Sequence, residues 1–197
     1  MNRIGMMIDV SHISDASFYD VIDCSSKPVV ATHSCCRALV SHPRNMTDEM
    51  IRVLASNGGV IQINFYPLFL DSGFSRILSD SGIMDYGEKI EEEFIKDPSD
   101  PQKRIAWNRV QDELQALARP SFMKIADHID HAVQVAGIDH VGLGSDFDGI
   151  EVTPAGLEDI SFMPVLLDEL SARGYSASDI SKIAGDNFFR VMDVCAR

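Results

Sequence analysis

The sequence predicts an α/β protein built around a parallel sheet. Short apolar runs recur along the chain without alternating polar residues, which is typical of strands buried on both faces. Stretches with helix caps and helical periodicity lie between them, and this alternation indicates the α/β class. With 197 residues, of which 45 % are hydrophobic, the chain suits one domain with a substantial core.

The first strand is expected at residues 6–10, within GMMIDVSH. Ser14 is a suitable N-cap for the helix that follows, from Asp15 to about Cys24. The second strand lies in KPVVATHS, and Thr47 can cap the next helix, DEMIRVLASN. Acidic residues in its first turn and Gly58 at its C-terminal end both favour that helix.

The third strand lies in GGVIQINFY, and the fourth lies in HVGLGSDFDG after a helix over about residues 121–136. Three further helices are expected over about 161–173, 177–184 and 187–195. Residues 70–119 are too long for a simple crossover, and they contain the acidic run DYGEKIEEEFIKDPSDPQ. We expect a helical insertion there, within a single partial barrel domain over residues 1–197.

Charge and cysteine content restrict the partners and the compartment. The net charge is −13, from 30 acidic and 17 basic residues, which argues against nucleic acid and anionic membranes because both need clustered Lys and Arg. No apolar stretch reaches the roughly 18 residues of a membrane-spanning helix. The four cysteines form no CxxC pair, and unpaired thiols favour a reducing cytoplasm.

Polar side chains follow the expected strands: His12, His33, Asn64 and Asp146. The carboxyl ends of parallel strands are where α/β proteins bind ligands. Imidazole and carboxylate are ligands of Zn²⁺, so two histidines and an aspartate at one edge would suit a catalytic metal that activates water. Alternatively, each histidine is an ordinary loop or capping residue.

The remaining histidines fit such a site less well. His128 and His131 lie on an expected helix, where hydrogen bonding along the helix face is the simpler interpretation. His140 precedes its strand, at the wrong end, and His42 lies in a loop that can reach the site. Arg44 follows in the same loop, where it is either a bidentate clamp for a substrate carboxylate or a surface arginine.

The segment SDFDGI allows two other interpretations. A DxDG motif after an apolar strand resembles the aspartate pair of phosphoryl-transfer enzymes, which would use Mg²⁺. In those enzymes the motif comes early and usually has Thr or Val where Ile150 stands. A calcium loop of EF-hand spacing would need Asp or Asn at Ile150 and Glu at Leu157. Both interpretations are weaker than the metal-hydrolase hypothesis.

Five blocks resemble the membrane (renal-type) dipeptidases, peptidase family M19, in order over nearly the whole chain. They are GMMIDVSH, ATHSCCRALVSHPRN, NGGVIQINFYPLFL, DHIDHAVQVAGIDHVGLGSDFDG and GLEDISFMPVLLDEL. The resemblance implies a (β/α)₈ TIM-type barrel with two zinc ions, which hydrolyses dipeptides, including some with a C-terminal D-residue. It implies that His12 and His33 bind the same zinc. It further implies that Arg44 holds the dipeptide carboxylate and that Asp146 is catalytic.

Three family features are missing: a His-x-Asp pair on the first strand, a bridging glutamate on the fourth, and a substrate-contacting histidine after it. Phe69 stands where some members carry a tyrosine, so an oxyanion contact is not expected there. We therefore interpret Met1 as an internal methionine and the chain as barrel strands five to eight. Such a half-barrel exposes two sheet edges, so we expect marginal stability, aggregation, or pairing with another chain, including a second copy.

Two functional hypotheses follow. The first is a zinc-dependent dipeptidase that acts on dipeptides through metal-activated water, with its activity impaired by the missing ligands. The second is a non-catalytic half-barrel that binds or assembles through its open sheet edges.

Overall fold

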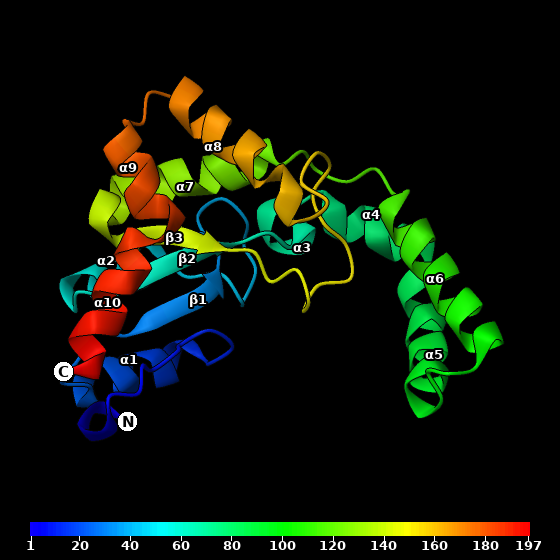
Figure 1. Cartoon of the computed structure of the whole chain (residues 1–197), viewed down its shortest axis with the longest axis horizontal. Coiled ribbons are helices and arrows are strands. Elements are labelled where there is room, and N and C mark those ends of the chain that lie inside the picture. The colour runs from blue at the N-terminus through cyan, green and yellow to red at the C-terminus, as the bar shows by residue number, and fades with distance from the viewer.

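The computed structural model describes residues 1–197, and a three-stranded parallel sheet lies at its centre (Figure 1). The strands are β1 (Val30–Ser34), β2 (Val60–Asn64) and β3 (Val141–Gly144), in the order β1-β2-β3. The α/β class and the parallel sheet are therefore confirmed, and the arrangement is consistent with part of a barrel.

The expected first strand at residues 6–10 is wrong. That segment makes one isolated parallel bridge, between Asp9 and Val30, and is not a regular strand. The reason is that side chains occupy the next amides of β1. The amide of Thr32 donates to the Asp9 carboxylate, and the amide of His33 donates to the Ser11 hydroxyl. The backbone ladder cannot continue past these two side-chain contacts.

The early helices form where their caps predict them. In α1 (Asp15–Cys24) the Ser14 hydroxyl accepts from an amide of the first turn, and in α2 (Asp48–Ser56) Thr47 does the same. Helix α7 (Met123–Ala136) precedes a short 3₁₀ turn (Ile138–His140) and β3. Further 3₁₀ turns lie at Asn2–Ile4 and Ile160–Phe162.

The chain closes with α8 (Met163–Ala172), α9 (Ala177–Ser181) and α10 (Asn187–Ala196). The helix expected over 177–184 is shorter than predicted, because a π-helical turn (Lys182–Asp186) with a non-helical Gly185 follows α9. No helix has both the length and the apolar character needed to cross a membrane.

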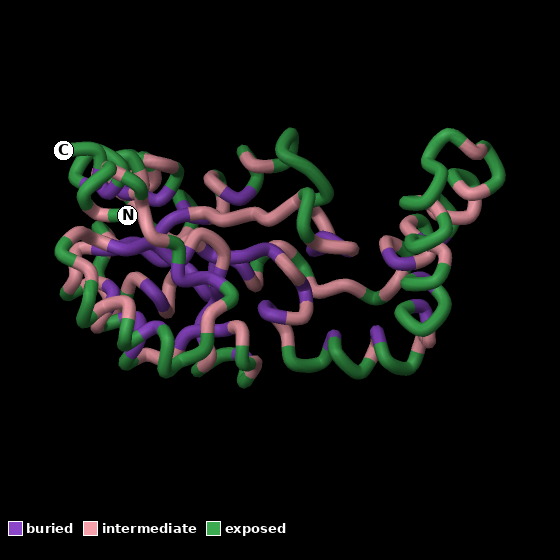
Figure 2. The backbone as a smooth tube through the Cα atoms, turned by 90° about the horizontal axis from the view of Figure 1, so that it is seen from below, coloured by how far each residue is buried: buried purple, intermediate pink, exposed green.

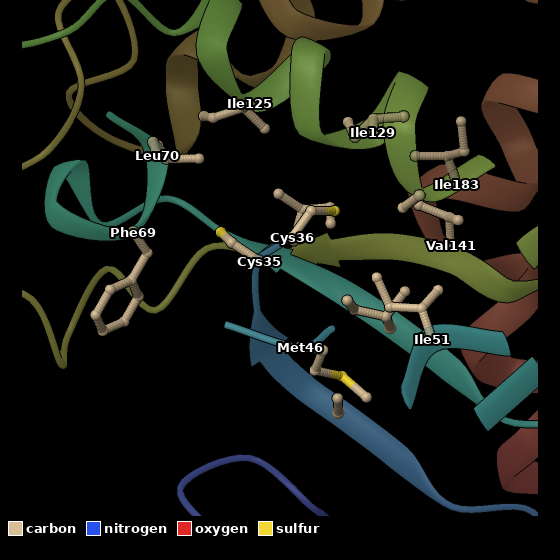
Figure 3. Packing of buried hydrophobic residues seen from close by; sticks show 14 of the residues in the cluster. Cys35, Cys36, Met46, Ile51, Phe69, Leu70, Ile125, Ile129, Val141 and Ile183 are labelled. Carbon is tan, nitrogen blue, oxygen red and sulfur yellow. The ribbon is translucent and has the colours of Figure 1, made fainter. Parts of the chain in front are cut away.

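The two faces of the sheet are covered differently. On one face Ala31, Ile61 and Val141 join the main core, in which Ile125 and Ile129 lie between α7 and the sheet (Figure 3). On the other face, Val30 and Val60 pack with Val191 and Cys195 of α10. Buried backbone is concentrated along the sheet and beneath its helices (Figure 2).

Gly144 shows how strongly this sheet curves. A Cβ atom on Gly144 would collide with the carbonyl oxygen of Thr32, although β2 lies between their two strands. Only a sheet that curls toward this face brings the outer strands so close, and only glycine fits the contact.

Residues between β2 and α7 form four helices: α3 (Pro67–Leu70), α4 (Phe74–Ser81), α5 (Ile83–Lys96) and α6 (Pro101–Gln115). The α5–α6 pair projects away from the sheet (Figures 1 and 2). A small core of its own holds this part together, and Phe94 stacks on Trp107 between the two helices.

Candidate functional site

His12 and His33 meet at the carboxyl end of β1. Their Nε2 atoms are 2.7 Å apart, and their ring centroids are 4.8 Å apart. His33 lies within β1, whereas His12 lies in the turn after the bridge of Asp9 and is exposed. The structure therefore brings together the two histidines that the sequence predicts as metal ligands.

A bulge in β1 explains why the side chain of His33 points toward His12. Ala31 pairs with Ile61 but Ser34 pairs with Ile63, so β1 holds one residue more than β2 over this stretch. Neighbouring residues of a regular strand point to opposite faces. Here Thr32 Oγ1 and His33 Nδ1 are only 2.8 Å apart, so the two side chains lie together. A bulge commonly re-aims a side chain in this manner.

Behind His33 lies a polar chain that the sequence did not reveal. The Thr32 hydroxyl donates to Asp9 Oδ2 at 2.5 Å, and Asp9 Oδ1 accepts from the amides of Ser11 and Thr32 at 2.9 and 3.1 Å. Partial burial raises the pKa of Asp9, but these hydrogen bonds outweigh it, so the pKa lies below the usual value. Asp9 is thus a carboxylate near neutral pH.

Asp146 lies just beyond β3 and is held by Asn64, the last residue of β2. The amide nitrogen Nδ2 of the fully buried Asn64 donates to Asp146 Oδ2 at 3.0 Å, while Asn64 Oδ1 accepts from the amide of Tyr66. A Cβ atom at position 149 would collide with the Asp146 carboxylate, so Gly149 leaves room for it.

His12 and Asp146 are the only non-glycine residues with a positive φ, 69° and 59° respectively. Such backbone is uncommon for residues with a Cβ atom and costs conformational energy. The surrounding hydrogen bonds must hold it in place. That both outliers are candidate site residues supports a functional role for this edge of the sheet.

Arg44 lies in the loop after β1, half-buried, with its guanidinium carbon 5.5 Å from the ring centre of Phe69. The ring of His42 packs on the same phenyl group, with centroids 4.7 Å apart. Burial, followed by the positive charge of Arg44, lowers the pKa of His12, which therefore is a neutral imidazole at pH 7. Arg44 thus shares the electrostatic surroundings of the histidine pair.

The histidines of α7 and of the turn before β3 lie away from this pair, but the two on α7 bond to other elements and not along their own helix face, as the sequence had suggested. His128 is buried in the core, where its Nδ1 accepts from the amide of Cys36. His131 Nε2 lies 2.7 Å from the carboxylate of Asp48 on α2. His140 Nδ1 donates to the carbonyl of Gly59, at the amino end of β3.

The histidine pair fits part of a zinc site. Two imidazoles that point their Nε2 atoms at one place are suitable zinc ligands. Catalytic zinc usually takes three protein ligands, and no group of three or more His, Cys, Asp or Glu side chains in this chain is arranged to hold a metal. The remaining ligands would have to come from groups outside the pair.

Comparison with known proteins identifies the family. The sequence model of the membrane dipeptidases, peptidase family M19, matches residues 1–196. The chain belongs to the membrane dipeptidase family. It is 36 % identical over 193 residues to dipeptidase verJ of Clonostachys rogersoniana, and 35 % identical over 192 residues to an uncharacterized dipeptidase of Schizosaccharomyces pombe.

Solved dipeptidases share its fold. The probable dipeptidase PvdM of Pseudomonas aeruginosa superposes with a TM-score of 0.75 at 29 % identity over 99 % of this chain. A metallo peptidase of Rhodobacter sphaeroides, liganded with a phosphinate mimic of the dipeptide L-Ala-D-Ala, gives a TM-score of 0.71 at 26 % identity over 98 % of this chain.

This member of the dipeptidase family spans only part of its relatives. The matched region covers 98 % of this chain but 38 % of dipeptidase verJ, and 97 % of this chain but 36 % of the S. pombe protein. It covers 52 % of the PvdM chain and 44 % of the R. sphaeroides chain.

Proposed function

We propose that this chain carries one part of a dipeptidase active site and that it hydrolyses the peptide bond of dipeptides with the help of zinc. The observation that supports the proposal most directly is the convergence of His12 Nε2 and His33 Nε2, 2.7 Å apart at the carboxyl end of β1. Family membership and the carboxylate of Asp146 at the same edge of the sheet agree with it.

In this proposal His12 and His33 hold one zinc of the family's pair. Zinc in such sites acts as a Lewis acid and makes water nucleophilic near neutral pH. Asp146, oriented by Asn64, accepts a proton and passes it to the leaving amine. Its fixed orientation matters, because proton transfer requires hydrogen-bond distance to the reacting group.

Substrate binding is assigned to Arg44. Its planar guanidinium can bind the free carboxylate of a dipeptide along one edge through two parallel hydrogen bonds, while its position over the Phe69 ring supports the group. A fixed carboxylate clamp would restrict substrates to short peptides. The R. sphaeroides relative, bound to its L-Ala-D-Ala mimic, supports dipeptides with a C-terminal D-residue as one substrate class.

We further propose that residues 1–197 act as one partial (β/α)₈ barrel domain, with α3–α6 as its helical excursion. Four free cysteines, three of them buried, support a cytoplasmic location.

The direct test is hydrolysis of L-Ala-D-Ala by the 197-residue chain with added Zn²⁺. We expect a zinc-dependent rate that His33→Ala and His12→Ala both abolish. His140→Ala is the matched control, because this histidine lies at the amino end of β3, away from the site. A rate that persists in His33→Ala would contradict the proposed role of the pair.

A second candidate function has its own supporting observation. Because no group of three metal-binding side chains exists in the chain, a non-catalytic subunit that binds one metal and assembles with another copy is also consistent with the site. Zinc binding without hydrolysis, together with a dimer in size-exclusion chromatography, would favour this function. Turnover by a monomer would exclude it.

A further inference from the structure

We propose that Thr32 and Asp9 form a positioning pair that fixes the tautomer of His33, so that its Nε2 atom presents the lone pair. Neither residue touches the place where the two histidines meet, and both would act through His33. The inference depends on the proposed function only in taking His33 as a metal ligand.

The positions of the hydrogens follow from counting donors. The Thr32 hydroxyl has a single hydrogen, and the Asp9 carboxylate can only accept. The distance of 2.5 Å between Thr32 Oγ1 and Asp9 Oδ2 therefore places that hydrogen on the line to Asp9. Thr32 Oγ1 is left as an acceptor, and its neighbour at 2.8 Å is His33 Nδ1. Nδ1 must carry the proton of the neutral ring, so Nε2 carries none.

The carboxylate of Asp9 is itself held in one orientation. Its Oδ1 atom accepts from the amides of Ser11 and Thr32, at 2.9 and 3.1 Å. Rotation of the carboxyl group would break both contacts, so Oδ2 stays directed at the Thr32 hydroxyl. Each hydrogen bond that leads from these backbone amides through Asp9 and Thr32 to His33 therefore has a fixed donor and a fixed acceptor. Carboxylates support the histidines of known zinc sites in a similar way.

The pair also determines the state of His12 before a metal arrives. The two Nε2 atoms are 2.7 Å apart, a hydrogen-bond distance, and one of them must donate. Since His33 Nε2 carries the lone pair, the donor is His12 Nε2–H. The two histidines therefore have opposite tautomers in the metal-free protein, and only His12 has to move its proton when a metal binds.

Nitrogen-15 NMR of the imidazole rings reads these tautomers directly in the metal-free, 197-residue chain at mildly alkaline pH. We expect His33 to show a protonated Nδ1 and a pyridine-like Nε2, with its signals assigned by their loss in His33→Gln. Thr32→Val should release the preference for the Nδ1–H form, and Thr32→Ser should restore it. These signals depend on proton position, which a purely structural role would not fix.

Asp9→Asn is the sharper variant because it keeps the size of the side chain. The asparagine oxygen stays on the two backbone amides, so its NH₂ group faces the Thr32 hydroxyl and donates to it. The hydroxyl hydrogen then points to His33 Nδ1, and the proton of the ring moves to Nε2. We expect the His33 tautomer to be inverted in this variant.

Zinc affinity, measured by calorimetry with Zn²⁺ alone, gives the second readout. Thr32→Val and Asp9→Asn should weaken binding by about 10–100-fold, and Thr32→Ser should stay close to wild type. Thr153→Val is the matched control, because it removes a buried hydroxyl that bonds to Gln115 and Arg119 and to neither histidine, so it should leave affinity unchanged.

Two results would overturn the inference: a wild-type His33 protonated on Nε2, or an Asp9→Asn chain with unchanged tautomer and unchanged affinity. If the wild-type chain binds no Zn²⁺, the proposed metal function fails, while the NMR comparison still decides whether Thr32 and Asp9 set the tautomer.

Discussion

The buried histidine in the core makes a quantitative prediction about stability and pH. His128 on α7 is 1 % exposed, its Nδ1 accepts from the amide of Cys36 at 3.1 Å, and its Nε2 lies 3.4 Å from the carbonyl of Leu70. Burial penalises the charged ring and lowers its pKa from 6.5 to about 4. The folded protein therefore resists protonation that the unfolded chain accepts.

The sign and size of the effect follow from this difference. Between pH 6.5 and about 4 the unfolded state binds a proton at this position and the folded state does not, so stability falls as pH falls. Each pH unit in this window is worth about 1.4 kcal/mol, and the whole window about 3 kcal/mol. Above pH 6.5 the histidine is neutral in both states and its contribution no longer changes.

Urea unfolding followed by circular dichroism, at several pH values across this window, measures the effect. In His128→Asn the asparagine Oδ1 can still accept from the Cys36 amide, but nothing titrates. The variant should lose stability near pH 7.5 through its missing ring contacts. The difference in free energy of unfolding between wild type and this variant should shrink by about 3 kcal/mol as the pH falls toward 4.

Ile129→Val is the control on the same helix: it should cost about 1 kcal/mol at every pH, since no ionisable group changes. A constant difference between wild type and His128→Asn across the window would refute the reasoning, because the folded-state pKa of His128 would then be normal.

Four further substitutions test the site and the sheet. Gly149→Ala places a methyl group against the Asp146 carboxylate, so hydrolysis should fall at least about 10-fold while the urea midpoint stays near wild type; an unchanged rate would show that Asp146 need not remain on Asn64. Gly144→Ala forces β1 and β3 apart and should prevent folding or cost at least about 3 kcal/mol in urea unfolding. Gly82 has a positive φ of 65° but open space around it, so Gly82→Ala should cost only about 1 kcal/mol. Equal losses of stability in these two variants would contradict the close contact between Gly144 and Thr32. Arg44→Lys should raise KM for a dipeptide about 10-fold with little change in kcat, because a point charge replaces a bidentate fork; a loss confined to kcat would exclude carboxylate binding.

Local signals in the sequence predicted local structure well. Ser14 and Thr47 mark the starts of α1 and α2 because an N-cap satisfies amides within three residues of itself. The segment at residues 6–10 failed for the opposite reason. Whether it continues as a strand depends on the amides of Thr32 and His33, and nothing in the local pattern shows that Asp9 and Ser11 will occupy them.

The candidate site was also predictable only as far as local patterns and general rules of the fold reach. The rule that ligands bind at the carboxyl ends of parallel strands placed His12, His33 and Asp146 at one edge, and Asn64 with them. The Asp9–Thr32 pair was missed, because it depends on a one-residue bulge in β1 that has no signature in the sequence. A β-branched threonine next to a histidine in a strand ordinarily predicts opposite faces.

The failure of the first strand and the geometry of the histidine pair have the same cause. Asp9 and Ser11 replace backbone carbonyls as acceptors for β1, so the chain leaves the ladder after a single bridge. Released from the ladder, the backbone turns at His12 through φ of 69°, which no regular strand allows, and brings its ring against His33. Had residues 6–10 continued as an ideal strand, alternation would have fixed the direction of His12, and Asp9 could not support Thr32. The irregular edge is thus what the site requires, and its cost in lost backbone pairing is offset by side-chain hydrogen bonds to the same amides.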